Sequence, residues 1–455
     1  MKTIPEFPEG FLWGAATSAY QIEGGATEGG RGPSIWDTFT HSDGPSPGAA
    51  TGDIACDHYH RWPEDVALLA DLGANAYRFS ISWPRIQPTG TGPANEQGLD
   101  FYDRLVDGLA EHGIAAVPTL YHWDLPQALE DEGGWMNRQT AYHFAEYAAV
   151  LADRLGDRVT TWITLNEPFI HMAFGYALGI HAPGRTLGLG ALPVAHHQLL
   201  AHGLAAAELR SRGLKVAIAN NCTPVHAASD APDDLAAAAA YDTLHNRLFN
   251  DPLMFGRYPD LSAFGAPADL PFVEDGDLKL ISAPLDLLGI NYYNPTLIAA
   301  ADPATAQEGD LPFDIRAIEG VPTTAFGWPV VPEGLTEILV ALRARYGDAL
   351  PPIVITENGC STRDTVEADG QIHDTERIEY LDGHLHAVHD AIAAGVDVRG
   401  YLTWSLIDNF EWAEGFEQRF GLVRVDFDTL ERIPKDSYDW YRSVIAAQPP
   451  AGPRP

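Results

Sequence analysis

The feature that most constrains the fold is a regular alternation of short apolar segments with helix-like segments along the 455 residues. Eight apolar segments are rich in β-forming residues and have the length of strands: Phe11–Thr17, Ala74–Ser82, Ile114–His122, Val159–Glu167, Leu214–Asn221, Leu285–Tyr293, Pro352–Asn358 and Val398–Ser405. Helical segments between them include Trp62–Leu72, Phe101–His112, Thr140–Leu155, Leu192–Arg212, Gly334–Tyr346 and Thr375–Ala394. Nearly continuous apolar strands that alternate with helices form parallel sheets covered by helices.

Eight strand–helix units predict an α/β fold of the closed (β/α)8 TIM-barrel type. A large doubly wound sheet is the alternative, but no glycine-rich phosphate-binding turn follows the first predicted strand. At ~150 residues per domain the length suggests about three domains, yet barrels with insertions exceed ~400 residues as one unit. We therefore expect a single domain over residues 1–447 and a Pro-rich tail over residues 448–455.

Two long insertions follow predicted strands. Gly29–Asp57 comes after the first strand, and Asn294–Pro332, which shows little periodicity, comes after the sixth. Both extend from the carboxyl ends of strands, where barrels keep their active sites. We expect long loops on this face.

The charge and the cysteine content exclude several classes of function. The chain has 63 acidic and 28 basic residues, a net charge of −35, which repels nucleic acids and anionic lipid surfaces. Its 3 cysteines are too few for a disulfide framework or a zinc cluster. No apolar run reaches the ~18 residues of a membrane span, and Met1–Pro8 does not resemble the start of a signal peptide. We expect a cytoplasmic protein without nucleic-acid or membrane partners.

Seven of the eight predicted strands carry, end in or lead to polar and aromatic residues at the face where an active site is expected. In chain order they are Gln21 and Glu23, Arg78, His122 to Asp124, Asn166 and Glu167, Asn291 to Tyr293, Glu357 and Asn358, and Trp404. Core packing does not explain so many polar side chains at one end of a barrel. They indicate a site that binds a polar ligand.

Glu167 and Glu357 are the two most informative of these residues. Each follows a β segment directly, and strands four and seven lie roughly across a barrel mouth from each other. Cleavage of a glycosidic bond needs two carboxyl groups, one to protonate the leaving oxygen and one to attack or stabilise the sugar carbon. One such Glu alone could be a surface residue at a strand end. The pair, with Asn166 and Asn358 beside it, favours glycosidase chemistry.

Five motifs in order carry a resemblance to a known family: Phe11–Gly24, Tyr77–Trp83, Thr164–Pro168, Ile355–Gly359 and Trp404–Trp412. With these motifs the chain resembles the β-glucosidases of glycoside hydrolase family one from Phe7 to Tyr441. The resemblance implies the barrel fold and hydrolysis with retention of configuration at the sugar carbon.

The resemblance also implies the catalytic roles. Glu167 corresponds to the general acid/base and Glu357 to the nucleophile, and retention requires the two carboxyl groups ~5–5.5 Å apart. We expect Arg78 and Tyr293 to keep Glu357 ionised. The charge of Glu357 should in turn raise the pKa of Glu167, so that Glu167 holds the proton that the leaving oxygen needs.

Further residues correspond to the family's sugar-binding groups. A ring of hydrogen-bonding residues around the nonreducing sugar comprises Gln21, His122, Asn166, Glu411 and Trp412. Trp404 corresponds to the floor beneath the sugar ring, and Trp328 and the Phe169–Tyr176 stretch to the leaving-group site. Taken alone, His122 could be a core histidine and Trp328 a packing residue under a long loop.

The substrate class depends on three positions after the eighth strand. Family members that act on 6-phosphorylated sugars carry Ser, Lys and Tyr there, whereas this chain has Glu411, Gln418 and Phe420. A carboxylate repels a phosphate and suits a free 6-hydroxyl. We therefore expect a neutral sugar.

Neither a metal nor a cofactor is expected. The histidines that could suggest metal ligands, His58, His60, His196, His197 and His202, lie in a loop or on a helix without a carboxylate or cysteine at a ligand spacing. Cys360 follows the Glu357 motif, but a second nucleophile at that place is not expected.

The sequence thus predicts a retaining β-glucosidase that hydrolyses terminal nonreducing β-D-glucosyl residues through a covalent glycosyl-enzyme intermediate. Small β-glucosides and cello-oligosaccharides are the expected substrates. β-Galactosides and β-fucosides come next, because Glu411 and Gln21 can hold either orientation of the 4-hydroxyl. The alternatives are a transglycosylase on the same fold and a noncatalytic sugar-binding barrel. A homo-oligomer is left open.

Overall fold

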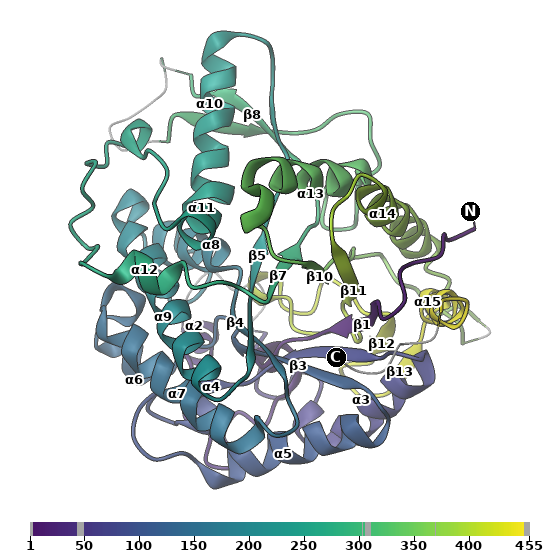
Figure 1. Cartoon of the computed structure of the whole chain (residues 1–455). Helices are drawn as coiled ribbons and strands as arrows, with labels where there is room; N and C mark the ends of the chain where they lie inside the picture. Colours follow the sequence, from purple (N-terminus) through teal and green to yellow (C-terminus); the bar gives the residue numbers. More distant parts are fainter. Residues whose placement is uncertain (1–2, 43–49, 303, 305–310, 369, 450–455) are drawn as a thin grey trace.

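The core of the protein is a closed barrel of eight parallel strands (Figure 1). The computed structural model describes residues 3–42, 50–302, 304, 311–368 and 370–449. The barrel strands are β1 (Leu12–Ala16), β2 (Ala76–Ser80), β3 (Ala115–Tyr121), β4 (Thr161–Asn166), β5 (Lys215–Asn221), β7 (Leu287–Asn291), β10 (Ile353–Glu357) and β11 (Val398–Trp404). β1 pairs with both β2 and β11, which closes the barrel. All eight predicted strands and the predicted (β/α)8 fold are confirmed.

Long helices surround the strands, as predicted. They are α3 (His58–Leu72), α5 (Glu96–Glu111), α7 (Gln139–Leu155), α9 (Leu192–Ser211), α13 (Glu333–Tyr346), α14 (Thr375–Ala393) and α15 (Asp436–Ala446). Two begin earlier than predicted, α3 at His58 instead of Trp62 and α5 at Glu96 instead of Phe101. The first turns of both carry mostly polar residues, so the apolar pattern begins only after each helix has started.

Shorter elements complete the described part of the chain. They are α1 (Ala19–Ile22), α2 (Ile35–His41), α4 (Trp83–Ile86), α6 (Gln127–Asp131), α8 (Pro168–Ile170), α10 (Pro232–Asp242), α11 (Leu248–Phe255), α12 (Asp277–Ile281), β6 (Val225–Ala227), β8 (Thr296–Ala300), β9 (Phe313–Arg316), β12 (Val423–Val425) and β13 (Arg432–Pro434). Single helical turns of other types lie at η2 (Gly134–Met136), η3 (His171–Ala177), η4 (Gly188–Ala191), η5 (Thr243–Arg247), η6 (Ser262–Phe264), η7 (Gly347–Ala349) and η8 (Trp412–Glu414).

The two insertions contain more regular structure than their sequences suggest. In the first, the Ser34 side chain and the Asp37 side chain cap each other's backbone N–H groups at the start of α2. In the second, which showed little periodicity, β8 and β9 pair as antiparallel strands and join β6 in a separate sheet. Figure 1 shows β8 beside α10 at one end of the molecule. Residues 43–49, 303 and 305–310 of these insertions lie outside the described residues.

The end of the predicted barrel domain is tied to its beginning. Gln448, the first residue of the predicted tail, accepts a hydrogen bond through Oε1 from the Phe7 N–H at 2.9 Å. Residues 450–455 of the predicted tail lie outside the described residues. Among the helices described, none combines the length and the apolar character needed to cross a membrane.

One close backbone approach inside the barrel yields a stability prediction. Gly14 on β1 lies opposite Ala76 on β2, and a Cβ atom at Gly14 would fall 1.8 Å from the Ala76 carbonyl oxygen. We expect Gly14→Ala to lower the free energy of unfolding by about 3 kcal/mol, because the two strands must separate to admit the methyl group. Urea denaturation followed by circular dichroism measures the change.

Gly190→Ala is the matched control for that prediction. A Cβ at Gly190 meets its nearest neighbour, the Cβ of Leu187, at an ordinary 3.8 Å. Equal stability of the two variants would contradict the assigned close approach between β1 and β2.

Candidate active site

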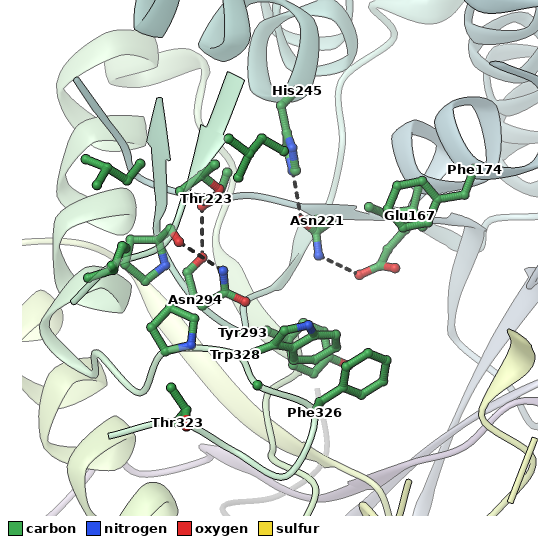
Figure 2. A pocket seen from close by; sticks show the side chains of 18 of the residues that line it. Glu167, Phe174, Asn221, Thr223, His245, Tyr293, Asn294, Thr323, Phe326 and Trp328 are labelled. Carbon is green, nitrogen blue, oxygen red and sulfur yellow. Dashed lines mark hydrogen bonds between the residues drawn. The ribbon is translucent and has the colours of Figure 1, made fainter. Parts of the chain in front are cut away.

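A cavity of about 860 Å³ opens at the carboxyl ends of the barrel strands. Its wall includes one residue from the end of each of six strands: His122, Glu167, Asn221, Tyr293, Glu357 and Trp404. The second insertion contributes Thr323, Phe326 and Trp328, several of which Figure 2 labels. The cavity therefore lies on the face where the sequence placed the site.

Glu167 follows β4 and projects into this cavity. Its backbone is in the left-handed region with φ of 44°, and its side chain is only 5% exposed. The amide groups of Asn221 and Asn291 both donate to its Oε1 atom, at 3.0 and 2.9 Å. Burial and, second, the charge of Glu357 raise the pKa of Glu167 to about 8. At neutral pH Glu167 therefore holds a proton.

Glu357 ends β10 and is 3% exposed. Its Oε1 atom accepts a hydrogen bond from Arg78 Nη1 at 2.5 Å, and its Oε2 atom accepts one from the Tyr293 hydroxyl at 2.7 Å. Burial and the charge of Glu357 raise the pKa of Tyr293, so the phenol keeps the proton that it donates. A charge-assisted bond on one oxygen and a phenol on the other hold this carboxylate in one orientation.

Asn166 and Asn291 connect the two carboxyl groups. The Asn291 amide donates to Asn166 Oδ1 as well as to Glu167, both at 2.9 Å. Asn166 Oδ1 also accepts from Arg78 Nη2 at 2.6 Å, and Arg78 is the residue that binds Glu357. The five side chains form one continuous hydrogen-bonded unit, in which a shift of either carboxyl group disturbs the other.

The predicted sugar-binding residues fall into two groups. His122, Trp404, Glu411 and Trp412 line the cavity. The His122 ring lies nearly parallel to both the Trp404 and the Trp412 ring, with centroids 5.8 and 5.9 Å away. Burial, with the charge of Arg78 second, holds the pKa of His122 well below its ordinary value, so the ring is neutral. Burial and the charge of Glu357 raise the pKa of Glu411 to about 8.

Gln21, Asn166 and Arg78 are buried and contact the lining residues without being among them. Gln21 Oε1 accepts from the Ser18 hydroxyl at 2.5 Å, and Gln21 Nε2 donates to the Phe410 carbonyl at 2.8 Å. Its contact with Glu411 Oε2 is longer, at 3.4 Å. In this structure Gln21 thus supports the Glu411 loop.

Trp328 has both of the properties considered for it, since it lines the cavity and packs against neighbouring rings. Phe326 stacks on it at 4.3 Å between centroids, and Tyr293 and Phe420 lie 5.3 and 5.9 Å away (Figure 2). Ile170 and Phe174, from the predicted Phe169–Tyr176 stretch, also line the cavity. The outer part of the site is therefore largely aromatic and aliphatic.

Several site residues carried no role in the sequence analysis. Asn291 was only noted at a strand end, and Asn221 and His245 were not considered. Asn221 ends β5, the one barrel strand for which no polar terminus was noted, and this position could have indicated it. No local signal points to His245, which lies on the short π-helical segment η5. Glu23, placed at the expected face, instead pairs with Arg85 at 2.9 Å.

The histidines considered as metal ligands have other partners. His58 contacts Asp65, His60 contacts Asp57, His196 contacts Asp277, His197 contacts the Trp135 carbonyl, and His202 contacts Thr164. Within the described ranges no group of three or more His, Cys, Asp or Glu residues could hold a metal ion. Burial raises the pKa of Cys360 to about 12, which leaves it a thiol and a poor nucleophile.

Comparison with known proteins agrees with this geometry. Residues 4–449 match the profile of glycosyl hydrolase family 1. A bifunctional β-D-glucosidase/β-D-fucosidase of Bifidobacterium breve is 48% identical over 97% of this chain and 98% of its own length. β-Glucosidase A of Thermotoga maritima is 45% identical over 97% of this chain and 98% of its own length.

Solved structures give the same result. The crystal structure of a psychrophilic β-glucosidase from Micrococcus antarcticus superimposes with a TM-score of 0.94 at 46% identity, covering 98% of this chain and 99% of that one. A family 1 β-glucosidase from Thermotoga maritima superimposes with a TM-score of 0.92 at 45% identity over 98% of this chain and 99% of that one. The chain therefore belongs to glycosyl hydrolase family 1.

Proposed function

We propose that the protein is a retaining β-glucosidase, with Glu357 as the nucleophile and Glu167 as the general acid/base. The observation that carries the assignment is the difference between the two carboxyl groups of one cavity. Glu357 accepts hydrogen bonds from Arg78 and Tyr293 on its two oxygens. Glu167 has its pKa raised to about 8 and accepts hydrogen bonds from the neutral amides of Asn221 and Asn291. An ionised and a protonated carboxyl group are what retaining hydrolysis requires.

In the first step a carboxylate oxygen of Glu357 attacks the anomeric carbon as the bond to the leaving oxygen breaks. The proton of Glu167 passes to that oxygen, and the sugar becomes an α-linked ester of Glu357. The ester carries no charge, so the pKa of Glu167 falls. Glu167 then takes a proton from water, the water oxygen attacks the anomeric carbon, and the ester bond to Glu357 breaks.

A neutral sugar fits the inner end of the cavity. Glu411 and Phe420 line it where members that act on 6-phosphorylated sugars carry a phosphate-binding set. Glu411 offers oxygens to sugar hydroxyls, and the Trp404 and Trp412 rings offer flat apolar faces to a sugar ring. These features support a terminal β-D-glucosyl residue, with β-galactosyl and β-fucosyl residues as further substrates.

Small β-glucosides and cello-oligosaccharides remain the proposed substrates. The relatives' names support both glucoside and fucoside cleavage. The outer wall, with Phe326, Trp328 and Phe174, supports aryl leaving groups through stacking and also accepts the apolar face of a second sugar ring.

A substrate panel followed by active-site labelling tests the proposal. The enzyme is incubated with 4-nitrophenyl β-glucoside, β-galactoside and β-fucoside and with cellobiose, and the first anomer released is identified by NMR. We expect hydrolysis with β-glucose appearing first. A 2-deoxy-2-fluoro-β-glucoside with a dinitrophenolate leaving group should then add one sugar mass to the peptide that contains Glu357.

Other results would reject parts of the proposal. Absence of turnover with every substrate would reject the enzyme in favour of a sugar-binding barrel. Transfer of the glucosyl group to a second sugar with little free glucose would identify a transglycosylase. A label on another residue would reject Glu357 as the nucleophile.

The raised pKa of Glu167 gives a pH prediction. A group with a pKa of about 8 is protonated below that pH and loses its proton above it. We expect kcat/KM for 4-nitrophenyl β-glucoside to fall as the pH rises through about 8, because the general acid is lost. Initial rates from pH 5 to pH 10 at low substrate concentration measure this decrease, which is the alkaline limb of the pH profile.

Glu167→Gln assigns the alkaline limb. Because the pKa of Glu411 is also raised to about 8, the wild-type profile alone does not separate the two groups. With the same 4-nitrophenyl β-glucoside, the limb should disappear in Glu167→Gln, because the amide has no acidic proton to lose. A limb that persists in this variant belongs to Glu411 and contradicts the assignment.

A further inference from the structure

We propose that His245 and Tyr241 are positioning residues that orient the Asn221 amide and thereby keep the acidic proton of Glu167 on its Oε2 atom. The inference rests on the proposed role of Glu167 as the general acid. It is carried by a chain of three hydrogen bonds in the cavity wall, part of which is visible in Figure 2.

The chain runs from the accessory elements to the barrel. The Tyr241 hydroxyl on α10 lies 3.1 Å from His245 Nδ1, and His245 Nε2 lies 2.8 Å from Asn221 Oδ1. Asn221 Nδ2 then donates to Glu167 Oε1 at 3.0 Å. Each residue contacts the next one, and Figure 2 shows His245 pointing from its helix toward Asn221 and Asn221 toward Glu167.

The His245 ring is fixed in place and neutral. It packs on Phe169 with 4.1 Å between ring centroids, and burial lowers its pKa to about 3. A neutral imidazole has one donor and one acceptor nitrogen. If Nε2 carries the hydrogen, it donates to Asn221 Oδ1, and Nδ1 accepts from the Tyr241 hydroxyl. Every hydrogen bond of the series then points toward Glu167, with Tyr241 donating to His245, His245 to Asn221 and Asn221 to Glu167.

The opposite direction is incompatible with the full reaction cycle. It would turn Asn221 Oδ1 toward Glu167 Oε1, where two acceptor oxygens would face each other once Glu167 is ionised. With Asn221 Nδ2 on Oε1, that oxygen accepts a hydrogen bond whether Glu167 is protonated or ionised. Only one direction therefore serves both the acid step and the base step.

Two donors on one oxygen decide where the proton lies. Asn221 and Asn291 both donate to Oε1, so a proton on that atom would meet two N–H groups. Oε2 has no hydrogen-bonding partner in the part of the chain that the structure describes, and Glu167 lines the cavity. The proton is therefore placed on Oε2, where a leaving-group oxygen can receive it.

The experiment compares His245→Phe with His245→Gln. Phenylalanine keeps a ring against Phe169 but cannot donate to Asn221, so the amide can rotate and its oxygen can accept a hydrogen bond from a protonated Oε1. We expect kcat/KM for an alkyl β-glucoside to fall about tenfold, a part of what a general acid contributes. The value for dinitrophenyl β-glucoside, whose leaving group needs no proton, should change less than about twofold.

The pH profile separates this role from a merely structural one. The charged and titratable groups around Glu167 include Glu357, Glu411, Arg78, Tyr293 and the thiol of Cys222, and His245→Phe leaves all of them in place. The oxygen of a rotated Asn221 amide accepts a hydrogen bond from protonated Glu167 and so stabilises the protonated form. The pKa of Glu167 therefore rises, and the alkaline limb of kcat/KM moves to higher pH. A loosened site would admit water and move the limb to lower pH.

His245→Gln supplies a donor amide at nearly the position of Nε2, and it should restore most of the alkyl glucoside activity and the wild-type limb. Equal behaviour of the Phe and Gln variants, or a limb that stays in place or moves to lower pH in His245→Phe, would overturn the proposal. If His245→Phe does not fold, Tyr241→Phe tests the proposal instead, because it removes the hydroxyl that donates to His245 Nδ1. The alkaline limb of kcat/KM should then move to higher pH by less than in His245→Phe. A limb that does not move counts against the proposal. Wild-type inactivity would instead reject the proposed function.

Discussion

Replacement of Glu357 by alanine is expected to lower kcat for 4-nitrophenyl β-glucoside by ~10⁴-fold or more. The reason is chemical: without this carboxylate no covalent intermediate forms, and Arg78 and Tyr293 lose the anion that they bind. Steady-state rates at saturating substrate measure the loss. Glu379→Ala, which changes an exposed glutamate on α14, is the matched control and should retain wild-type activity.

Rescue by azide makes the Glu357 prediction specific. In Glu357→Ala the small anion can enter the space that the carboxylate leaves and attack the anomeric carbon from the same face. Because this single displacement inverts the configuration, a β-glucoside with a good leaving group should give α-glucosyl azide. A β-glucosyl azide product would mean that another residue of the cavity still acts as the nucleophile.

Replacement of Glu167 by alanine should have an effect that depends on the leaving group. Alkyl β-glucosides should lose ~10²–10⁴-fold in kcat/KM, because their alkoxide leaving groups need a proton. Dinitrophenyl β-glucoside should form the glycosyl-enzyme nearly as fast as with the wild type, and its slow hydrolysis should appear as a burst followed by a low steady rate. Stopped-flow absorbance of the released phenol records both phases.

Azide should also restore turnover in Glu167→Ala, but with the opposite product. The anion attacks the α-linked ester of Glu357 and needs no general base, so it should give β-glucosyl azide. Opposite azide anomers from the two variants would assign the two carboxyl groups independently of any rate. Equal losses for alkyl and dinitrophenyl glucosides would contradict the acid role of Glu167.

Much of the fold could be predicted from the sequence, because a barrel strand is buried on both faces and is therefore apolar along most of its length. The segments that became β4 and β10 show this pattern and then change abruptly at Asn166–Glu167 and at Glu357–Asn358. A change from apolar to polar at a strand end is a local signal. It located both carboxyl groups on the correct face of the barrel.

The tertiary structure alone decided how the site is held together. Asn291 and Asn221 lie far from Glu167 in the chain and meet it only when the barrel closes, and His245 reaches Glu167 only through Asn221. Hydrogen-bond partners depend on distance and angle in space, which periodicity does not encode. Gln21 is a residue for which the sequence predicted a contact with sugar. Its position in a motif did not show that its amide would donate to the Phe410 carbonyl behind the cavity wall.

The sequence by itself thus determined the barrel, the face of the site and the positions of the two carboxyl groups at strand ends, because each depends on the order of apolar and polar residues along the chain. The tertiary structure decided the separate sheet of β6, β8 and β9, the network around Glu167 and the proton held there. Burial is the largest cause of the raised pKa of Glu167, with the charge of Glu357 second. Burial is a property of the whole fold, because many distant side chains together exclude the water that would otherwise solvate the charge.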